Sequence, residues 1–569
     1  MPQLGTVYVF VIFVFLARRL GGRSLPLSWG SKFGRECNKI ARTFSIDQFS
    51  VAVKFVLPGT VTERNRAWIN ICSAPWLRPA STNSVKVLIK ECIGGASGKS
   101  GSGSQFPHLL RYSRSVRQIH STRMDPAKFG LTEEDVELIV KRYLLEKREK
   151  YNAKFRVLSY HIKRLSEEPI GYLGDHYFLN VVLREKMVHY SAEEEEYAEE
   201  EYLSFFMKIL PEQVPKLADY VREMGCFKKE SQLYTHLIPR LQDVSIGTKP
   251  FAPRAYLTKD DKLLVFENLK AEGYRMVQNN KSLLDYAHLK VALKTVAKLH
   301  AASLVLEERT KQPITQLYSG HLNENVYIDD DRYVRKTNLD NAIKALCELI
   351  KRIEKYKTSD RLDFILEKFP QVIRKIYEFA KPSTVYRNVF NHGDLWNNNL
   401  MFKYEELNSS RTSSDAGLSS PLDGILLDYQ LSRYAPPALD VLTVITIATV
   451  SDFRARYLDD LLNIYYESLA AELAASGIKL SKKIPRSEFD ASCEFYRLAG
   501  LVECCLFSQT ILIPMELAKP LMATSESFEK FIHDADAKTA LHVRSFEQDE
   551  SFRTRFTDML SEIIDNYIL

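Results

Sequence analysis

The hydrophobic pattern of this chain changes near residue 280, and that change leaves few possible folds. Before it, several short segments are rich in β-branched and aromatic residues and are separated by glycines or by an acidic run. After it, apolar residues recur at helical spacing almost to the C-terminus. The sequence therefore predicts an α+β fold with two lobes: a small, mostly antiparallel sheet followed by a larger helical body.

The first 123 residues differ in charge from the rest of the chain. They hold 18 Lys and Arg against 4 Asp and Glu, whereas the remaining 446 residues hold 60 against 68. The positive excess thus belongs to a leader, and it does not indicate a nucleic-acid partner. We expect residues 1–123 to be a basic, disordered leader, residues 124–270 to form the first lobe, and residues 271–569 to form the second.

The leader opens with an apolar run closed by Arg18 and Arg19, and this run of about a dozen residues is short for a membrane span of about 20. Its later part is rich in Arg and Ser and poor in acidic residues, as transit peptides are. A third interpretation is a chain that really starts at Met124. We expect a cytoplasmic protein, with membrane association or an organellar location only if this leader is retained.

The first lobe begins at a helix signal. Thr132 can cap a helix whose first turn is acidic, and Val136, Ile139, Val140 and Leu144 form one apolar face. Three strand-like segments follow: KFRVLSYHIKRL, YFLNVVLREKMVHY and EYLSFFMKILP. We therefore expect a helix and then three successive strands.

One cation stands in the third of these strands. Lys208 is surrounded by apolar residues, and residues 227–241 (FKKESQLYTHLIPRL) predict a helix with Glu230 near its start. Kinases use a strand-borne lysine, paired with a helix-borne glutamate, to orient the phosphates of ATP. Taken alone, the two residues also fit a strand lysine that extends to solvent and a surface glutamate.

Residues 391–400, NHGDLWNNNL, interrupt the helical pattern of the second lobe. Asp394 and Asn399 stand five apart, as Asp and Asn do in the kinase catalytic loop H-R-D-x-x-x-x-N. The strand-like LMFKY and GILLDYQ, with a polar insertion at about 404–423 between them, predict a hairpin that delivers Asp428. Phosphoryl transfer needs a carboxylate for the attacking hydroxyl and oxygen ligands for Mg²⁺. Asp394 and Asn399 thus stand where the catalytic loop has its Asp and Asn, and Asp428 stands in the place of the metal-binding Asp of D-F-G.

Four motifs, in order within about residues 130–560, resemble the ecdysteroid kinase-like family of arthropods, which is related to choline kinases and aminoglycoside phosphotransferases. They are FKKESQLYTHLIPRL, KLHAASL, HGDLWNNN and LLDYQLSRYAPPALDVLTVI. The resemblance implies a protein-kinase-like fold that transfers the γ-phosphoryl group of ATP to a hydroxyl of a small molecule. Ecdysteroids are the namesake substrates of the family.

The resemblance also implies roles for single residues. Asp394 would be the catalytic base, and Asn399 and Asp428 would hold Mg²⁺. Lys208 would contact the ATP phosphates while paired with Glu230. The hinge whose backbone meets adenine would run from Glu267 to Leu269. His392 and Asp440 would brace the catalytic loop rather than react.

The chain departs from the family pattern in its N-terminal half. Asn268 stands where the family usually has Asp, and the segment IGYLGDHYFLN is less rich in Gly and Ser than the family's phosphate loop. Gly171 and Gly174 could still let the backbone approach the phosphates. This departure keeps open a catalytically silent pseudokinase.

A choline- or ethanolamine-type kinase is the other alternative, and an acidic or aromatic acceptor pocket would favour it. The apolar segment EFYRLAGLVECCLFSQTILIPMELA suits a pocket for an apolar acceptor and a helical core equally well. A protein substrate is not indicated, because no Ala-Pro-Glu segment follows Asp428.

Overall fold

The computed structural model describes residues 50–54, 68–72, 126–147, 154–165, 173–185, 199–245, 249–277, 283–404 and 420–569. The chain divides into two compact units, Met1–Arg117 and Gln118–Leu569. In the first unit, β1 (Ser50–Lys54) and β2 (Trp68–Cys72) pair antiparallel. Most of the predicted leader, Gly171 and residues 405–419 of the polar insertion lie outside the described residues.

The described part of the second unit opens with the short 3-10 turn Pro126–Phe129, which is followed by the predicted helix, α3 (Glu133–Lys147). The Asp135 N–H donates to the Thr132 hydroxyl, and the Thr132 N–H donates to the Asp135 carboxylate. This reciprocal cap fixes the start of the helix. The predicted apolar face of α3 is buried against the sheet.

A five-stranded antiparallel sheet forms the first lobe, in the spatial order β3-β4-β5-β7-β6. Its strands are β3 (Phe155–Arg164), β4 (Asp175–Glu185), β5 (Glu201–Ile209), β6 (Ala255–Lys259) and β7 (Leu263–Glu267). Alternate residues of β5, including Phe205 and Met207, join the core shared with α3. Because side chains alternate along a strand, Lys208 lies on the opposite face.

The segment after β5 covers that opposite face. Its helices are α4 (Pro215–Glu223), α5 (Cys226–Gln232) and α6 (Ile238–Val244), with the π-helical turn Leu233–Leu237 between the last two. Gly225, at φ +65°, makes the corner between α4 and α5. The predicted helix over 227–241 is thus confirmed, with an interruption that the pattern did not show.

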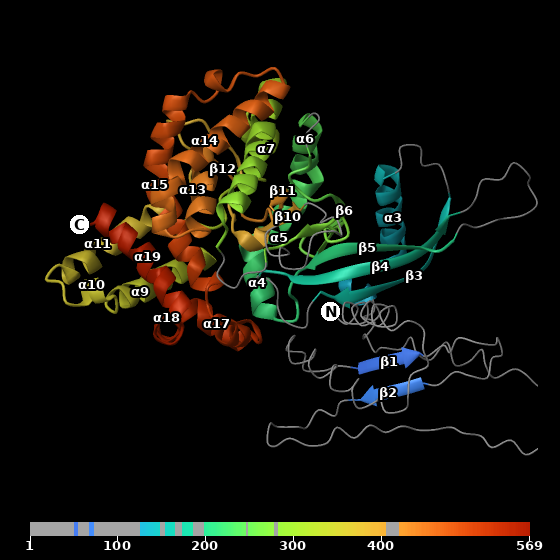
Figure 1. The fold of residues 1–569 in the computed structure, drawn as a ribbon, viewed down its shortest axis with the longest axis horizontal. Helices are drawn as coiled ribbons and strands as arrows, with labels where there is room; N and C mark the ends of the chain where they lie inside the picture. Colours follow the sequence, from blue (N-terminus) through green and yellow to red (C-terminus); the bar gives the residue numbers. More distant parts are fainter. Residues whose placement is uncertain are drawn as a thin grey trace, which may run out of the picture. The chain divides into compact units, whose positions relative to one another are not determined.

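The second lobe is mostly helical, as predicted, and α7, α13, α14 and α15 stand together in it (Figure 1). Its helices are α7 (Tyr286–Thr310), α8 (Ile314–Leu317), α9 (Val334–Ile350), α10 (Glu354–Lys357), α11 (Leu362–Arg374), α12 (Ile376–Phe379), α13 (Pro437–Ile447), α14 (Ser451–Ala475), α15 (Arg486–Ile511), α16 (Met515–Ala518), α17 (Ser525–His533), α18 (Ala535–Gln548) and α19 (Glu550–Tyr567). Short 3-10 turns occur at Asn397–Asn399, Leu480–Lys482 and Lys519–Met522. The apolar segment within α15 is mostly core, since Leu498, Val502 and Cys505 are buried.

Two small sheets interrupt the helices. Strands β8 (Tyr274–Arg275), β10 (Leu400–Tyr404) and β11 (Pro421–Leu426) form the first, in the order β11-β10-β8. Strands β9 (Val389–Asn391) and β12 (Arg433–Ala435) pair antiparallel as the second. The β10–β11 pair is the predicted hairpin, and together the two sheets carry both loops of the predicted site.

No single helix among the residues that the structure describes is long and apolar enough to cross a membrane. The segments Arg486–Ile511 and Met515–Met522 reach the required length and hydropathy only together, and they are bent by 75° at the break between them.

Candidate active site

Lys208 and Glu230, predicted as partners, meet on the covered face of the sheet. The Lys208 Nζ lies 2.6 Å from the Glu230 Oε2, and both side chains are buried, with exposed fractions of 5% and 1%. Burial raises the pKa of Glu230, and the ammonium of Lys208 opposes that shift. A buried pair of this kind costs desolvation, and removal of either charge would leave the other unpaired.

Lys208 also reaches the hairpin of the second lobe. Its ammonium lies 2.8 Å from Asp428 Oδ1 and donates to Gln430 Oε1 at 3.3 Å. Although burial works to lower the pKa of Lys208, the carboxylates of Asp428 and Glu230 raise it above its ordinary value. One cation therefore links the sheet, helix α5 and the turn that follows β11.

Asp428 adopts a left-handed backbone conformation, with φ +66°. Asp tolerates this region better than most residues, and such conformations occur often at functional sites. The side chain is 25% exposed, more open than its partners, and its second oxygen accepts a hydrogen bond from Gln430 Nε2 at 3.2 Å. The turn thus presents a carboxylate that is fixed yet accessible.

The loop that carries Asp394 makes a turn that only glycine fits. Gly393 has φ +79°, and a Cβ there would lie 2.2 Å from the Leu431 carbonyl oxygen. Both facts exclude a side chain. The glycine lets the chain pass against the segment after Asp428, so the two loops of the site are in direct contact.

Hydrogen bonds to the side chains of Asp440 and His392 fix this loop. The Asp440 carboxylate accepts the His392 N–H at 2.6 Å, the Gly393 N–H at 3.0 Å and a bond from His300 Nε2 at 3.2 Å. Burial would raise the pKa of Asp440, but the bonds from His300 and from the loop lower it. The side chain is therefore an ionised anchor.

Both ring nitrogens of His392 form hydrogen bonds within the protein. Its Nδ1 accepts the Asp394 N–H at 3.2 Å, so its Nε2 must carry the proton that it shares with the Leu427 carbonyl at 2.9 Å. Burial lowers its pKa and keeps the ring neutral. These contacts agree with the bracing role of His392 and Asp440, which stays a prediction.

Asn399 ties Asp394 to the hairpin. Its Nδ2 donates to the Asp394 carbonyl at 2.8 Å, and its own carbonyl accepts the Leu427 N–H at 2.9 Å. Burial, and next the charge of Asp428, raise the pKa of the Asp394 carboxyl above its usual value. The three residues predicted for catalysis and metal binding are thus gathered at one place.

The donor atoms here fit Mg²⁺. Asp428 and Asn399 offer carboxylate and amide oxygens, which are hard ligands of the type this ion prefers. Within the described part of the chain, no group of three His, Cys, Asp or Glu side chains could hold a metal alone. Kinase sites complete the coordination of Mg²⁺ with phosphate oxygens and water, so this pair suits a metal that binds together with a nucleotide.

The residues predicted to meet the nucleotide, Glu267 and Leu269, lie at the end of β7 and just after it. The Glu267 N–H donates to the Arg254 carbonyl at 3.0 Å, and its carboxylate accepts the Arg254 N–H, so its main-chain N–H is already used. Leu269 is buried in a small apolar cluster with Tyr274 and residues of the hairpin. Their contacts with adenine remain predictions.

Gly174 contacts Lys208 directly. A Cβ at Gly174 would come within 3.1 Å of the Lys208 Cε, so the absence of a side chain gives the lysine room. This is a packing role that the sequence did not suggest. The predicted contact of Gly174 with phosphate stays a prediction.

Three residues next to the site were not predicted from the sequence: Gln430, Arg433 and Glu503. Arg433 is fully buried, lies 2.7 Å from the Glu503 carboxylate, and would be 3.4 Å from a Cβ on Gly393. The signal for Glu503 was present, because it is the single charge in the apolar run LAGLVECCLF. Such a charge requires a buried partner, but the sequence does not identify that partner.

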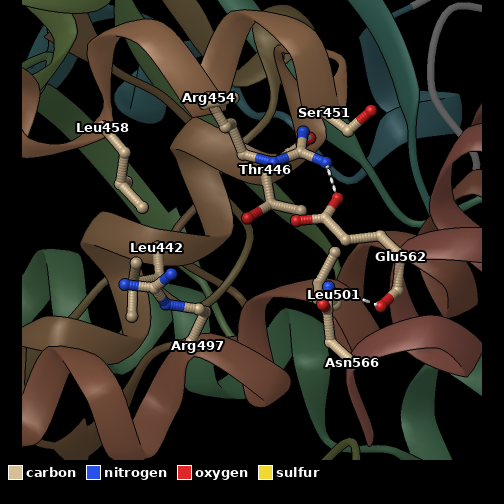
Figure 2. Close-up of a pocket in the computed structure, with 10 residues that line it drawn as sticks. Leu442, Thr446, Ser451, Arg454, Leu458, Arg497, Leu501, Glu562 and Asn566 are labelled. Atoms are coloured by element: carbon tan, nitrogen blue, oxygen red, sulfur yellow. Dashed lines mark hydrogen bonds and ion pairs between the residues drawn. The ribbon is translucent and has the colours of Figure 1, made fainter. Parts of the chain in front are cut away.

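A cavity of about 280 Å³ lies among α13, α14, α15 and α19. Figure 2 shows Arg454 directed toward Glu562 there, and Leu442, Leu458 and Leu501 also line the cavity. None of the predicted site residues lines it. Its charged groups are paired within the protein, and we assign it no part in the site.

Comparison with known proteins gives a family and several similar structures. The family model described as "Ecdysteroid kinase-like family" matches residues 174–478. No protein with a curated function matches the chain. Similar solved structures include choline kinase LicA from Streptococcus pneumoniae, at 10% identity over 74% of this chain and 99% of that chain, with a TM-score of 0.30.

Two further structures are similar to a comparable extent. A microcompartment-associated aminopropanol kinase is 14% identical over 72% of this chain and 98% of that chain, with a TM-score of 0.27. A choline/ethanolamine kinase family protein from Mesorhizobium loti is 12% identical over 70% and 92%, with a TM-score of 0.24. The family match covers more than half of the chain and includes all the predicted site residues except Gly171. This chain belongs to the ecdysteroid kinase-like family, and it is a small-molecule kinase with an alcohol group as acceptor.

Proposed function

We propose that the chain transfers the γ-phosphoryl group of ATP, with Mg²⁺, to a hydroxyl group of a small molecule. The observation that carries this proposal is the meeting of Lys208, Asp394 and Asp428 from three distant segments. Phosphoryl transfer depends mainly on positioning and on stabilisation of charge, and these residue types supply both.

Each side chain has a defined task in this proposal. Lys208, held by Glu230, contacts the phosphates of ATP. Asp428 and Asn399 would hold Mg²⁺, and the ion would supply positive charge to neutralise the negative charge that develops on the phosphates. The Lys208 ammonium, 2.8 Å from Asp428 Oδ1, keeps this carboxylate in position.

Asp394 acts on the acceptor. The acceptor oxygen forms a bond to the γ-phosphorus, the bond from that phosphorus to the bridging oxygen breaks, and ADP leaves. The hydroxyl proton passes to the Asp394 carboxylate. Burial raises the pKa of this carboxyl, so its ionised form is a stronger base than an exposed aspartate.

The acceptor that we favour is a steroid such as an ecdysteroid. This choice rests on the family to which the chain belongs. A choline- or ethanolamine-type amino alcohol is the alternative, and a test should therefore include both classes.

The test is phosphorylation by the full-length chain of a panel of ecdysteroids, choline, ethanolamine and sugars with Mg·ATP. We expect one class to gain about 80 Da in mass spectrometry, the mass that one phosphoryl group adds. Asp394→Asn should abolish that product.

Asp423→Asn is the matched control. Asp423 is also a buried aspartate of this region, but it bonds Lys298 and the Tyr274 hydroxyl instead of the predicted site. It should keep the activity. If ATP binds and no acceptor gains mass, the proposed acceptors are wrong and a catalytically silent binder becomes the better reading.

A further inference from the structure

Residues 323–327, in the connection between α8 and α9, contact three parts of the candidate site. We call this segment the 323–327 loop. It received no role from the sequence, and it belongs to the second lobe although it touches a helix of the first.

The loop binds α5 through Lys229, the residue next to Glu230. The Lys229 Nζ donates to the Asn323 carbonyl at 2.7 Å and to the Asn325 Oδ1 at 2.8 Å. Lys229 is buried, so these oxygens replace water around its charge. The helix that presents Glu230 to Lys208 is thereby attached to the loop.

The same amide of Asn325 binds the turn that carries Asp428. Its Nδ2 donates to the Gln430 carbonyl at 3.1 Å and to the Met224 carbonyl at 3.3 Å, just before α5. The side chain of Gln430 in turn bonds both Asp428 and Lys208. One buried side chain therefore contacts both elements that supply the carboxylates around Lys208.

The loop also reaches the segment beside the catalytic loop. The Glu324 carboxylate lies 3.2 Å from the Arg433 Nε, and it accepts the N–H groups of Val326 and Tyr327. The Tyr333 hydroxyl donates to the Asn325 carbonyl at 2.7 Å. These bonds hold the 323–327 loop itself in one conformation.

We propose that Asn325 is a positioning residue for phosphoryl transfer, whose side chain couples the helix that carries Glu230 to the turn that carries Asp428. This role rests on the proposed function. Without the coupling, the two elements move separately, and a bound nucleotide must restrict that motion at the expense of its affinity. Asn325 touches no reacting atom and acts through Glu230 and Asp428.

A purely structural asparagine would look similar in one respect, because a buried amide needs partners wherever it lies. Asn341 on α9 is such a residue. It has the same exposed fraction, 8%, and donates to the carbonyls of Ile532 and His533 at 3.2 and 3.1 Å. Asn341→Ala is therefore the matched control for Asn325→Ala.

The experiment compares the full-length wild type, Asn325→Ala and Asn341→Ala in two measurements. Calorimetry gives the dissociation constant of Mg·ATP, and hydrogen exchange with mass spectrometry reports the order of α5 and of residues 427–432. We expect Asn325→Ala to weaken Mg·ATP binding about tenfold, the scale of one or two buried hydrogen bonds. Exchange should rise in both α5 and residues 427–432. Asn341→Ala should change affinity less than about twofold and should raise exchange only near α9 and α17.

Asn325→Asp separates the two contacts. A carboxylate can still accept from Lys229, but it cannot donate to the Gln430 carbonyl. If coupling is the role, this variant loses Mg·ATP affinity as the alanine variant does, even where its thermal stability stays near that of the wild type.

The outcomes are distinguishable. Equal losses of affinity in the Asn325 and Asn341 variants, or an exchange increase confined to the 323–327 loop, would overturn the positioning role and leave the proposed function intact. A wild type that binds no Mg·ATP would overturn the proposed function, and the positioning role with it.

Discussion

Gly393 illustrates how a single residue sets the geometry of the site. The tripeptide His-Gly-Asp is visible in the sequence, but the reason for its glycine is the Leu431 carbonyl, which lies where a Cβ would be. The strain of a positive φ and this contact act at the same position. They can be separated by comparison with another glycine.

We expect Gly393→Ala to destabilise the protein by more than about 3 kcal/mol and to abolish Mg·ATP binding, because the clash forces the two loops apart. Gly477→Ala is the control, since Gly477 also has a positive φ, +72°, but open space around it. It should cost about 1 kcal/mol and leave binding unchanged. Thermal unfolding and calorimetry measure both effects. Equal costs would show that backbone strain alone explains Gly393.

At the scale of elements, the position and length of the helical segment that carries Glu230 were predicted, but its interruption by a π-helical turn was not. Pro239 has no N–H, so it cannot bond the carbonyl four residues earlier. In the structure, the π-helical turn Leu233–Leu237 lies just before this proline. The proline was a readable signal for this interruption. The packing of Tyr234, which lies in this turn, against Phe266 and Tyr429 is visible only in the tertiary structure.

A second element-scale feature is a buried cation between α9 and α18. Lys538 bonds the Asn338 Oδ1 at 2.7 Å and lies 4.1 Å from the Phe531 ring. Burial, and next the charge of Arg335, lower its pKa to about 7, while His542 on the same helix is held neutral by burial. The folded protein therefore binds this proton more weakly than the unfolded chain does.

The sign of the resulting pH dependence follows. Between pH 7 and the ordinary lysine pKa, the unfolded state holds the proton that the folded state releases, so stability rises with pH in that window. Lys538→Met removes this contribution. As pH rises within this window, the free energy of unfolding of the wild type should therefore increase relative to that of Lys538→Met. The increase is at most about 1.4 kcal/mol per pH unit. Denaturant unfolding at pH 7 and 9.5 measures it, and a constant difference would contradict it.

At the scale of the whole molecule, side chains of both lobes meet at the candidate site. Lys208 of β5 contacts Asp428 of the second lobe, 220 residues away, and Asn325 of the second lobe bonds Lys229 and the Met224 carbonyl of the first. A ligand that binds at this junction contacts both lobes and so stabilises the fold as a unit.

We therefore expect Mg·ATP at about 100 times its dissociation constant to stabilise the protein by about 2.7 kcal/mol. Removal of Mg²⁺ with a chelator should abolish most of this gain, since Asp428 and Asn399 would lose their bridge to the phosphates. Asp428→Asn should also lose it, whereas Asp423→Asn should retain it. Thermal unfolding with and without nucleotide is the measurement, and a gain independent of Mg²⁺ would contradict the assigned ligands.

The sequence by itself determined the two-lobed fold, the helix and strands of the first lobe, and the hairpin that carries Asp428. It could do so because hydrophobic periodicity and short-range capping are local, and they report which face of an element is buried. The five-residue spacing of Asp394 and Asn399 is local in the same sense. Only the tertiary structure decided that Lys208 bonds Asp428, and that Arg433 pairs with Glu503. The same holds for the bond between the 323–327 loop and the turn that carries Asp428. A buried charge shows in the sequence that a partner is needed, but the packing of distant elements selects which residue that partner is.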